Sequence, residues 1–280
     1  MKLTLPVMLL GVGLCGCGSP AKMTVDQPAA FIQSNTLDDT TRSPANLGCL
    51  PKKTDPAAPT MPSTLTVIVS DFEKKTPVKD ATVEVYTTLA KFNAATPDAT
   101  SGPTDAQGKA TLTVPGGSYR VIFRTIGDAS TVETIEFNRA FDDGKRYSVS
   151  QSTKSTIAAV LSLVPDNTLG VVAGSLRDCD EKEVGGITFE THTTTGPAFD
   201  NSLYTFYFID ANANSTVPFR AQKFTSGNGV FASLNVPPGN VQLVASGRTT
   251  TGGTVAQLGT GTAPVRANSV TVVQIEPSAQ

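Results

Sequence analysis

Hydrophobic and polar residues alternate with a period of two along most of the chain beyond residue 62. Four runs, TLTVIVS (64–70), ATVEVYT (81–87), KATLTVP (109–115) and YRVIFRT (119–125), place an apolar residue at every second position. Successive side chains of a strand point to opposite faces, so this alternation predicts half-buried β-strands. Gly116 and Gly117 separate the last two runs and predict a hairpin turn.

The same pattern returns in the second part of the chain. EVGGITFETHT (183–193) matches PVKDATVEVYT (77–87), and TSGNGVFASLNVPPGNVQLVAS (225–246) matches TDAQGKATLTVPGGSYRVIFRT (104–125). A repeat at this spacing predicts two copies of one domain. The second copy has one extra residue between Gly229 and Val236. We expect a β-bulge there, which keeps Leu234 and Val236 facing inward after Phe231.

The segment between the copies is ambiguous. Residues 157–164 of STIAAVLSLVP are apolar at nearly every position, which suits a buried helix as well as a strand. The Ser/Thr flanks and the short length favour a strand that lies where the two domains meet. We therefore predict an all-β protein with tandem β-sandwiches at 63–165 and 168–277. The linker Pro165–Thr168 is short, so we expect the domains to touch.

Composition supports a β-rich fold and excludes some partners. The 280 residues include 39 Thr and 27 Val, and only 16% are charged, below the usual fraction of about 25%. The formal net charge is −2, from 22 basic and 24 acidic residues that are scattered singly. This distribution provides no electrostatic footprint for nucleic acid or for anionic lipid.

The first residues are typical of a secretory signal. Lys2 precedes an apolar stretch from Leu3 to Leu14, which is too short for the roughly 20 residues of a membrane-spanning helix. Leu14-Cys15-Gly16-Cys17 resembles the bacterial lipobox, which implies a signal peptide over 1–16 and lipidation of Cys17. Gly18 follows the cysteine, and by the same resemblance this implies a lipid anchor in the outer membrane. The alternative is an ordinary signal that is cut elsewhere, giving a freely secreted protein.

Residues 17–62 contain seven prolines and little hydrophobic periodicity. This composition predicts a disordered, lipidated tether. The short apolar patch Ala29–Ile32 could instead dock on a domain.

Several motifs together resemble the carboxypeptidase regulatory-like module, a transthyretin-like β-sandwich. The resemblance lies in the strand that begins at Pro77, in the T-x-x-x-G turn at Thr104, and in the strand pair VPGGSY (114–119). It covers 63–127, and the second copy more loosely, so the second domain could also be a divergent immunoglobulin-like sandwich. The resemblance implies a binding module that does no chemistry itself.

Candidate chemistry is sparse. His192 is the only histidine, and its place in the repeat puts it on the outward face of a strand. No nucleophile or zinc-peptidase motif is present, so we expect no enzymatic activity, no catalytic residue, no cofactor and no metal. Asp210, Asn212 and Asn214 match the start of a calcium loop, but Ser215 and Ala221 break the pattern, so a polar turn is favoured. The acidic residues between Asp178 and Glu183 are interpreted as a solvated turn.

Cysteine arithmetic suggests one disulfide. With Cys17 lipidated and Cys15 removed with the signal, Cys49 and Cys179 remain to pair in an exported protein. Two free thiols, or bridges to other chains, are the alternatives.

These observations favour a non-enzymatic lipoprotein of the cell envelope that contacts a protein partner through loops on rigid sandwiches. The candidate loops are Thr88–Pro103, Thr193–Ser202 and Arg248–Gly253. Each could equally be a mobile connector without a ligand. The alternative function is glycan binding to cell-wall or surface polysaccharide, although the absence of Trp argues against the usual aromatic platform.

Overall fold

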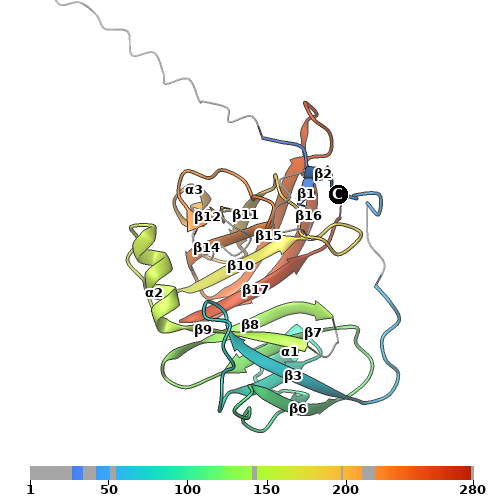
Figure 1. The fold of residues 1–280 in the computed structure, drawn as a ribbon, viewed down its shortest axis with the longest axis vertical. Helices are drawn as coiled ribbons and strands as arrows, with labels where there is room; N and C mark the ends of the chain where they lie inside the picture. Colours follow the sequence, from blue (N-terminus) through green and yellow to red (C-terminus); the bar gives the residue numbers. More distant parts are fainter. Residues whose placement is uncertain are drawn as a thin grey trace, which may run out of the picture.

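A computed structural model describes residues 27–33, 42–50, 55–140, 144–196, 198–209 and 218–278. Within these ranges the chain forms seventeen strands in several sheets and only three short helices, so the protein is mostly β (Figure 1). None of the described helices is long and apolar enough to cross a bilayer. The predicted signal peptide and Cys17 lie outside the described residues.

The first half consists of two facing sheets. One sheet contains β3 (Ser63–Asp71), β6 (Lys109–Val114) and β9 (Gly144–Ser150). The other contains β4 (Thr82–Tyr86), β5 (Ala99–Thr100), β7 (Arg120–Ile126) and β8 (Thr131–Ala140). The alternating apolar residues of the four runs pack between them, including Val67, Val83, Leu112 and Phe123.

The second half repeats this arrangement. One sheet contains β10 (Gly170–Leu176), β12 (Thr205–Phe208), β13 (Pro218–Phe219), β14 (Val230–Val236) and β17 (Ser269–Ile275). The other contains β11 (Thr188–Thr193), β15 (Gly239–Arg248) and β16 (Val255–Val265). Their shared core includes Leu176, Ile187, Phe231 and Leu243, all fully buried.

Several strand pairings recur in the two halves. In the first half β3 pairs antiparallel with β6 and parallel with β9, while β7 lies between β4 and β8. In the second half β10 pairs antiparallel with β14 and parallel with β17, while β15 lies between β11 and β16. The halves differ in one place, because β5 joins β4 whereas β12 and β13 join the sheet of β14.

The predicted β-bulge is present in β14. Gly170 pairs with Val236 and Val172 with Ser233, so three steps along β14 oppose two along β10. Asn235 takes a left-handed backbone conformation there, with φ of 55°. The prediction for Leu234 is wrong, because this side chain does not join Val236 in the core between the sheets. It packs on the opposite face of the sheet, under a helix.

That helix is α2 (Gln151–Val160), in the segment for which we predicted a strand. The prediction fails because Ser150 caps the helix, its hydroxyl accepting the N–H of Thr153 at 3.0 Å. Ala158 and Leu161 then fall on one face and pack against Phe206 and Phe208. A short apolar run is compatible with a helix or a strand. Here it forms a helix that covers the apolar outer face of the sheet formed by β12 and β14.

The two halves share a continuous sheet. β8 of the first half pairs in parallel with β17 of the second half, in register from Glu133 opposite Ser269 to Phe137 opposite Val273. The sheet consequently runs without a break from β13 to β5 across both halves. The expected contact between the halves is confirmed, and it is a backbone hydrogen-bonded joint (Figure 1).

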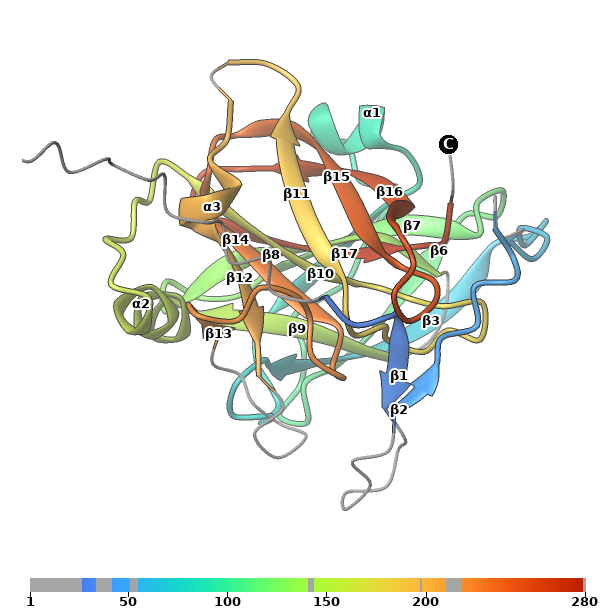
Figure 2. The same cartoon turned by 90° about the horizontal axis from the view of Figure 1, so that it is seen from above.

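Residues 27–33 and 42–50 are packed on the second half, so the prediction of a disordered tether is wrong for them. β1 (Phe31–Gln33) pairs with β2 (Arg42–Pro44) (Figure 2). Ala30 belongs to the core of the second half, and Phe31 is buried. Residues 55–62 instead contact the first half, where Pro59 O accepts the N–H of Gly117 at 2.7 Å. The alternative interpretation of the apolar patch is therefore confirmed. Gly185 makes this docking possible, because a Cβ there would lie 2.4 Å from the Phe31 ring.

Candidate functional site

The described residues line a cleft of about 440 Å³ between the two halves. Its floor is the outer face of the sheet β14–β10–β17, the face that points away from the core of the second half. β9 and Phe72 form one wall, and α2 forms another through Lys154 and Ile157. A cleft of this size is within the range of small-molecule binding sites.

The floor changes character along its length. In β10 the floor residues are Val171, Ala173 and Ser175, and in β17 they are Val270, Val272 and Gln274. These strands run parallel, with Val171 opposite Val270 and Ser175 opposite Gln274. The cleft is therefore apolar at the end where these strands begin and polar at the end where they finish. We call the second end the polar end.

Three cationic side chains surround the polar end. Arg139 donates to Gln274 Oε1 at 3.1 Å and pairs with the buried Glu136 at 3.3 Å, and Arg177 pairs with Glu183 at 3.1 Å. Lys145 on β9 is exposed and makes no ion pair with any described residue. Among all described side chains that line the cleft, five are cationic and one, Glu183, is acidic. The whole chain has slightly more acidic than basic residues, so this balance is a local feature.

Lys154 closes the apolar end. Only 7% of this residue is exposed, and its ammonium group donates to Asn268 Oδ1 at 2.8 Å and Asn167 Oδ1 at 3.2 Å. Both partners are neutral amides. Burial lowers the pKa of Lys154, because the desolvated ammonium is partnered without a carboxylate in contact.

The candidate loop Thr88–Pro103 is largely ordered structure. It contains α1 (Leu89–Asn93) and β5, and Phe92 is buried against Tyr86. Asp98 Oδ2 accepts the backbone N–H and the hydroxyl of Thr87, both at 2.8 Å, and Asp98 also pairs with Lys91. The interpretation of this segment as a mobile connector is therefore wrong.

The other two loops lie at opposite ends of one sheet. β11 and β15 are antiparallel, with Thr193 opposite Val241 and Thr188 opposite Ser246. The loop after Thr193 therefore emerges at the start of β15, and the turn after Arg248 emerges at its end (Figure 2). These two loops cannot contribute to a single contact surface.

α1 lies at the same end as the loop after Thr193. Thr194 bonds to Asn240 O near the start of β15, and Arg266, in the turn that follows β16, donates to Phe92 O at 2.8 Å. Asn240 pairs with the end of β16, which connects the two sets of contacts. We call the exposed residues of α1 and its C-cap Ala94, together with those of 194–196, the α1 end.

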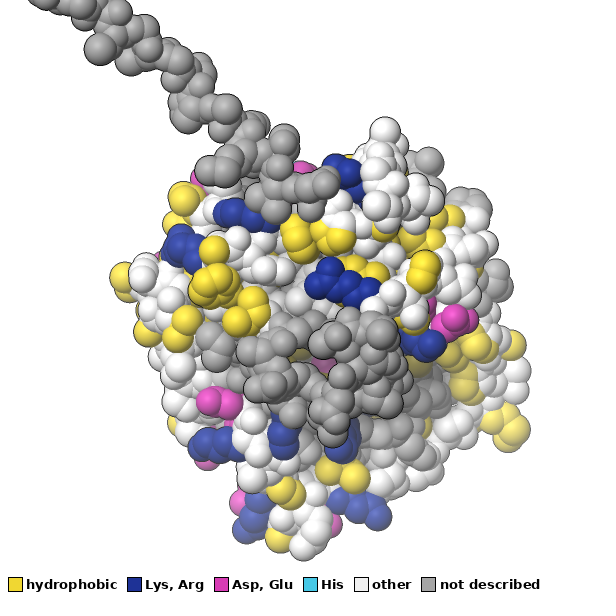
Figure 3. Space-filling model, turned by 45° about the horizontal axis from the view of Figure 1, so that its top comes forward, with side chains coloured by type: hydrophobic (Ala, Val, Ile, Leu, Met, Phe, Trp, Pro, Cys, Tyr) yellow, Lys and Arg dark blue, Asp and Glu magenta, His cyan; other side chains and the backbone are white. Residues whose placement is uncertain are grey.

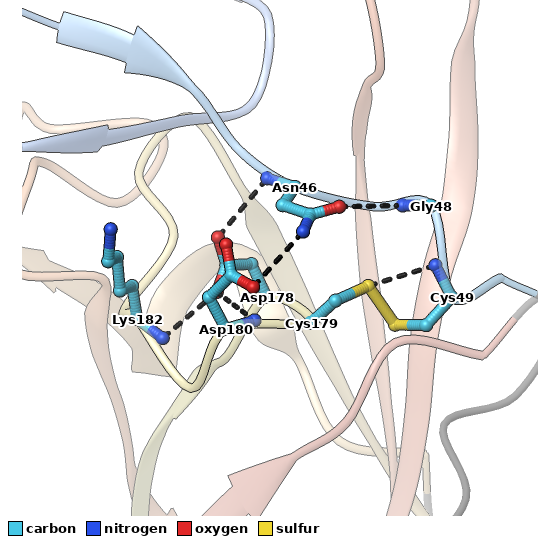
Figure 4. Close-up of a disulfide and its surroundings, with 7 residues drawn as sticks. All are labelled: Asn46, Gly48, Cys49, Asp178, Cys179, Asp180 and Lys182. Carbon is cyan, nitrogen blue, oxygen red and sulfur yellow. Dashed lines mark hydrogen bonds between the residues drawn. A yellow bond between two sulfur atoms is a disulfide. The ribbon is translucent and has the colours of Figure 1, made fainter.

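Cys49 and Cys179 form the predicted disulfide, with their Cα atoms 5.8 Å apart (Figure 4). The surrounding backbone supports the link. Asn46 O accepts the N–H of Cys179 at 2.9 Å, and the N–H of Asn46 donates to Asp178 Oδ2 at 3.1 Å. The disulfide attaches the N-terminal segment to the turn between β10 and β11.

We predicted that the acidic turn after β10 would be solvated, and this prediction is wrong for Asp178. Asp178 is fully buried, and its Oδ1 accepts the N–H groups of Asp180 and Lys182, both at 2.9 Å (Figure 4). This carboxylate therefore organises the turn that carries Cys179. Glu181 and Glu183 contact Arg177, the first through its backbone carbonyl and the second through its carboxylate.

His192 lies on β11 with its side chain 49% exposed, as predicted, and Nε2 is 3.1 Å from Glu190 Oε2. Its counterpart in the repeat, Tyr86, is buried because α1 covers that strand. Within the described ranges, no group of three or more His, Cys, Asp or Glu side chains is placed to hold a metal ion. The calcium-like segment Asp210–Ser215 lies outside the described residues.

Charged side chains are spread over the face shown in Figure 3. Lys and Arg side chains lie there in small separate groups, several of them beside Asp or Glu.

Sequence reasoning missed the cleft, although one signal was available. LGVVAGSLR and SVTVVQI carry small or apolar residues on both faces, which indicates strands covered on both sides. Nothing in the sequence, however, shows that β8 pairs with β17, and this pairing places β9 opposite the floor.

No protein-family model and no curated protein matches the chain. Among solved structures, the Bacillus anthracis TIE protein is 14% identical with a TM-score of 0.23, covering 78% of this chain and 34% of its own. The shaft pilin spaA from Lactobacillus rhamnosus GG has the same identity and TM-score, covering 78% and 99%. A Streptococcal ancillary pilin is 9% identical with a TM-score of 0.23, covering 77% and 68%. The chain thus spans about a third of the TIE protein, and similarities at this level assign it no function.

Proposed function

We propose that the protein is a non-enzymatic lipoprotein of the cell envelope that binds a protein partner at its α1 end. In this proposal Cys17 carries the lipid anchor in the outer membrane. The two sandwiches, residues 63–165 and 168–277, act together as one support. The carboxypeptidase regulatory-like assignment of the sandwiches remains part of the proposal.

One observation carries the proposal: two of the three candidate loops emerge at the same end, and the α1 segment is held in place there. Phe92 is buried, Asp98 fixes both ends of the α1 segment, and the ring of Phe92 lies 4.2 Å from the guanidinium of Arg266. Loops that are already ordered lose less conformational entropy on binding than free loops do. The α1 end is therefore better suited to partner capture than the isolated turn after Arg248.

Site-specific photocrosslinking in the intact envelope tests this surface. A photoreactive residue is placed at Ala94 in one variant and at Thr195 in another, both of which are exposed at the α1 end. Thr251, exposed in the turn between β15 and β16 at the opposite end of the sheet, is the matched control.

We expect the same crosslinked polypeptide from Ala94 and Thr195 and none from Thr251. Equal crosslinking from all three positions, or none from the first two, would contradict the proposal. Crosslinks from the α1 end to polysaccharide instead of polypeptide would replace it by the glycan-binding alternative.

Metabolic labelling with a fatty-acid analogue tests the anchor. We expect the wild-type chain to be labelled and to fractionate with the outer membrane, whereas Cys17→Ala is unlabelled. Cys15→Ala is the matched control and should be labelled like the wild type. Label that persists on Cys17→Ala would rule out this anchor.

A further inference from the structure

We propose that the cleft between the halves binds a single-chain amphiphile with an anionic head group, with the head at the polar end and the chain directed toward Val171. This inference is independent of the proposed function, since the cleft and the α1 end involve different residues. It rests on the apolar floor of the cleft and on the cationic side chains at one end of it.

The floor suits an amphiphile because its polarity changes along one axis. On β10 and β17 the positions that face the cleft run from valine at one end to Ser175 and Gln274 at the other, while β14 contributes apolar residues throughout. Four residues of strand separate Val171 from Ser175, a length of roughly 13 Å. An extended hydrocarbon chain can lie along this distance and bury apolar surface without leaving a polar group unsatisfied.

The charge balance selects an anionic head group. Arg139, Lys145 and Arg177 surround the polar end, and Glu183 is the only acidic residue among the described lining. Arg139 is paired with the buried carboxylate of Glu136 at 3.3 Å, and Arg177 is paired with Glu183 at 3.1 Å. Lys145 has no ion-pair partner among the described residues and is the cation most available to a ligand. A carboxylate or a phosphate at this position would gain charge-assisted hydrogen bonds, whereas a cationic head group would be repelled.

Ser175 adds a neutral hydrogen-bonding group at the polar end. Its side chain lines the cleft, and its hydroxyl makes no hydrogen bond to any described residue. The hydroxyl oxygen is not among the side-chain atoms that are cut off from solvent, so water can reach it in the cleft. A head-group oxygen at the polar end would accept the hydrogen bond that water otherwise accepts.

Titration calorimetry tests the proposal on the exported full chain carrying Cys17→Ala, which avoids the detergent that an acyl anchor requires. The probes are dodecanoate, dodecyl phosphate and dodecyltrimethylammonium, each below its critical micelle concentration. These probes share one chain and differ in the head group. We expect one or both anions to bind and the cation to bind at least about tenfold more weakly. The tighter anion identifies the head group as carboxylate or phosphate.

Two lysines form a matched pair of variants. Lys145 on β9 and Lys109 on β6 lie on either side of Ile68 of β3, and both are exposed, but only Lys145 lines the cleft. We expect Lys145→Ala to weaken anion binding by about three- to tenfold, in line with the loss of one partly screened charge. Lys109→Ala should leave it unchanged.

Ala173→Phe fills the middle of the floor and should abolish binding of the tighter anion. If this variant loses its cooperative thermal transition, Val272→Phe on the neighbouring strand replaces it. The proposal is overturned if neither anion binds, if the cation binds as tightly as the anions, or if a folded floor variant binds like the wild type. Crosslinking at the α1 end would be unaffected by any of these results.

Discussion

Thr104 in the first half and Thr225 in the second half make the same pair of hydrogen bonds. Each hydroxyl accepts the backbone N–H of the residue just before β4 or β11, and donates to the carbonyl of the residue three positions before that donor. The distances are 2.9 Å from Ala81 N and 2.7 Å to Val78 O for Thr104, and 3.0 Å from Ile187 N and 3.1 Å to Val184 O for Thr225. The repeat therefore extends from backbone topology to an individual side chain.

Thr104→Val and Thr225→Val should each lower the free energy of unfolding by about 1–3 kcal/mol, because each leaves a buried N–H and a carbonyl without their partner. Urea denaturation measures the change. Thr113→Val is the control, since Thr113 is exposed on β6, and its effect should stay within about 0.5 kcal/mol. Effects of equal size at Thr113 and Thr104 would contradict the assigned role.

Removing the disulfide with Cys49→Ser and Cys179→Ser should lower the free energy of unfolding by about 2–4 kcal/mol, because it frees a long loop in the unfolded chain. The hydrogen bonds of Asn46 remain, so the N-terminal segment should stay docked at low denaturant. Urea denaturation with and without reductant makes the measurement. An unchanged wild-type midpoint on reduction would argue against a stabilising role.

Asp98 should contribute to stability above the pKa of an unfolded aspartate, about 3.9. Burial alone would raise the pKa of Asp98, but the hydrogen bonds from Lys91 and Thr87 outweigh it and lower the pKa. A lowered folded-state pKa means that the contribution is complete above pH 4 and is lost as the pH falls through the folded value. Thermal unfolding of the wild type and Asp98→Asn should therefore converge at acid pH. Asp80→Asn, at an exposed position, should not show this convergence.

The shared sheet predicts that both halves unfold together. Calorimetry of the full chain should show one cooperative transition, because separating the halves breaks the β8–β17 ladder. Residues 63–165 alone should self-associate in size-exclusion chromatography, since they expose the edge of β8. Two resolved transitions, one of which the isolated segment reproduces, would show that the halves are independent.

Sequence alone predicted the strands whose two faces differ. In the runs around Val67, Val83 and Leu112 one face of the strand is buried and the other is not. The alternation of apolar and polar residues along the sequence therefore indicates a strand. It could not predict α2, since its short apolar run has no decisive period. The pairing that creates the cleft is also absent from local pattern, because β8 and β17 lie more than 130 residues apart and either could form an edge strand.

From the sequence, docking of the N-terminal segment was only the alternative to a disordered tether. The reason is again that the local pattern is too short to decide. Ala29–Ile32 is too short to show a period, and its burial depends on the missing side chain of Gly185, far away in the chain. The ordered α1 segment was missed because the segment is long and its Thr, Pro and Gly residues are typical of a loop. Its order comes from Phe92 and from the carboxylate of Asp98.

The Cys49–Cys179 bond also determines how the molecule would carry mechanical tension. The bond closes a loop with a sequence separation of 130, and this loop contains the whole first half. A pull applied to residues ahead of Cys49 passes through the sulfur atoms directly into the turn before β11, so the first half lies outside the path of the force. Under load it is the second half that must resist, while the first half remains a folded side branch that stretching cannot unravel until the disulfide is reduced.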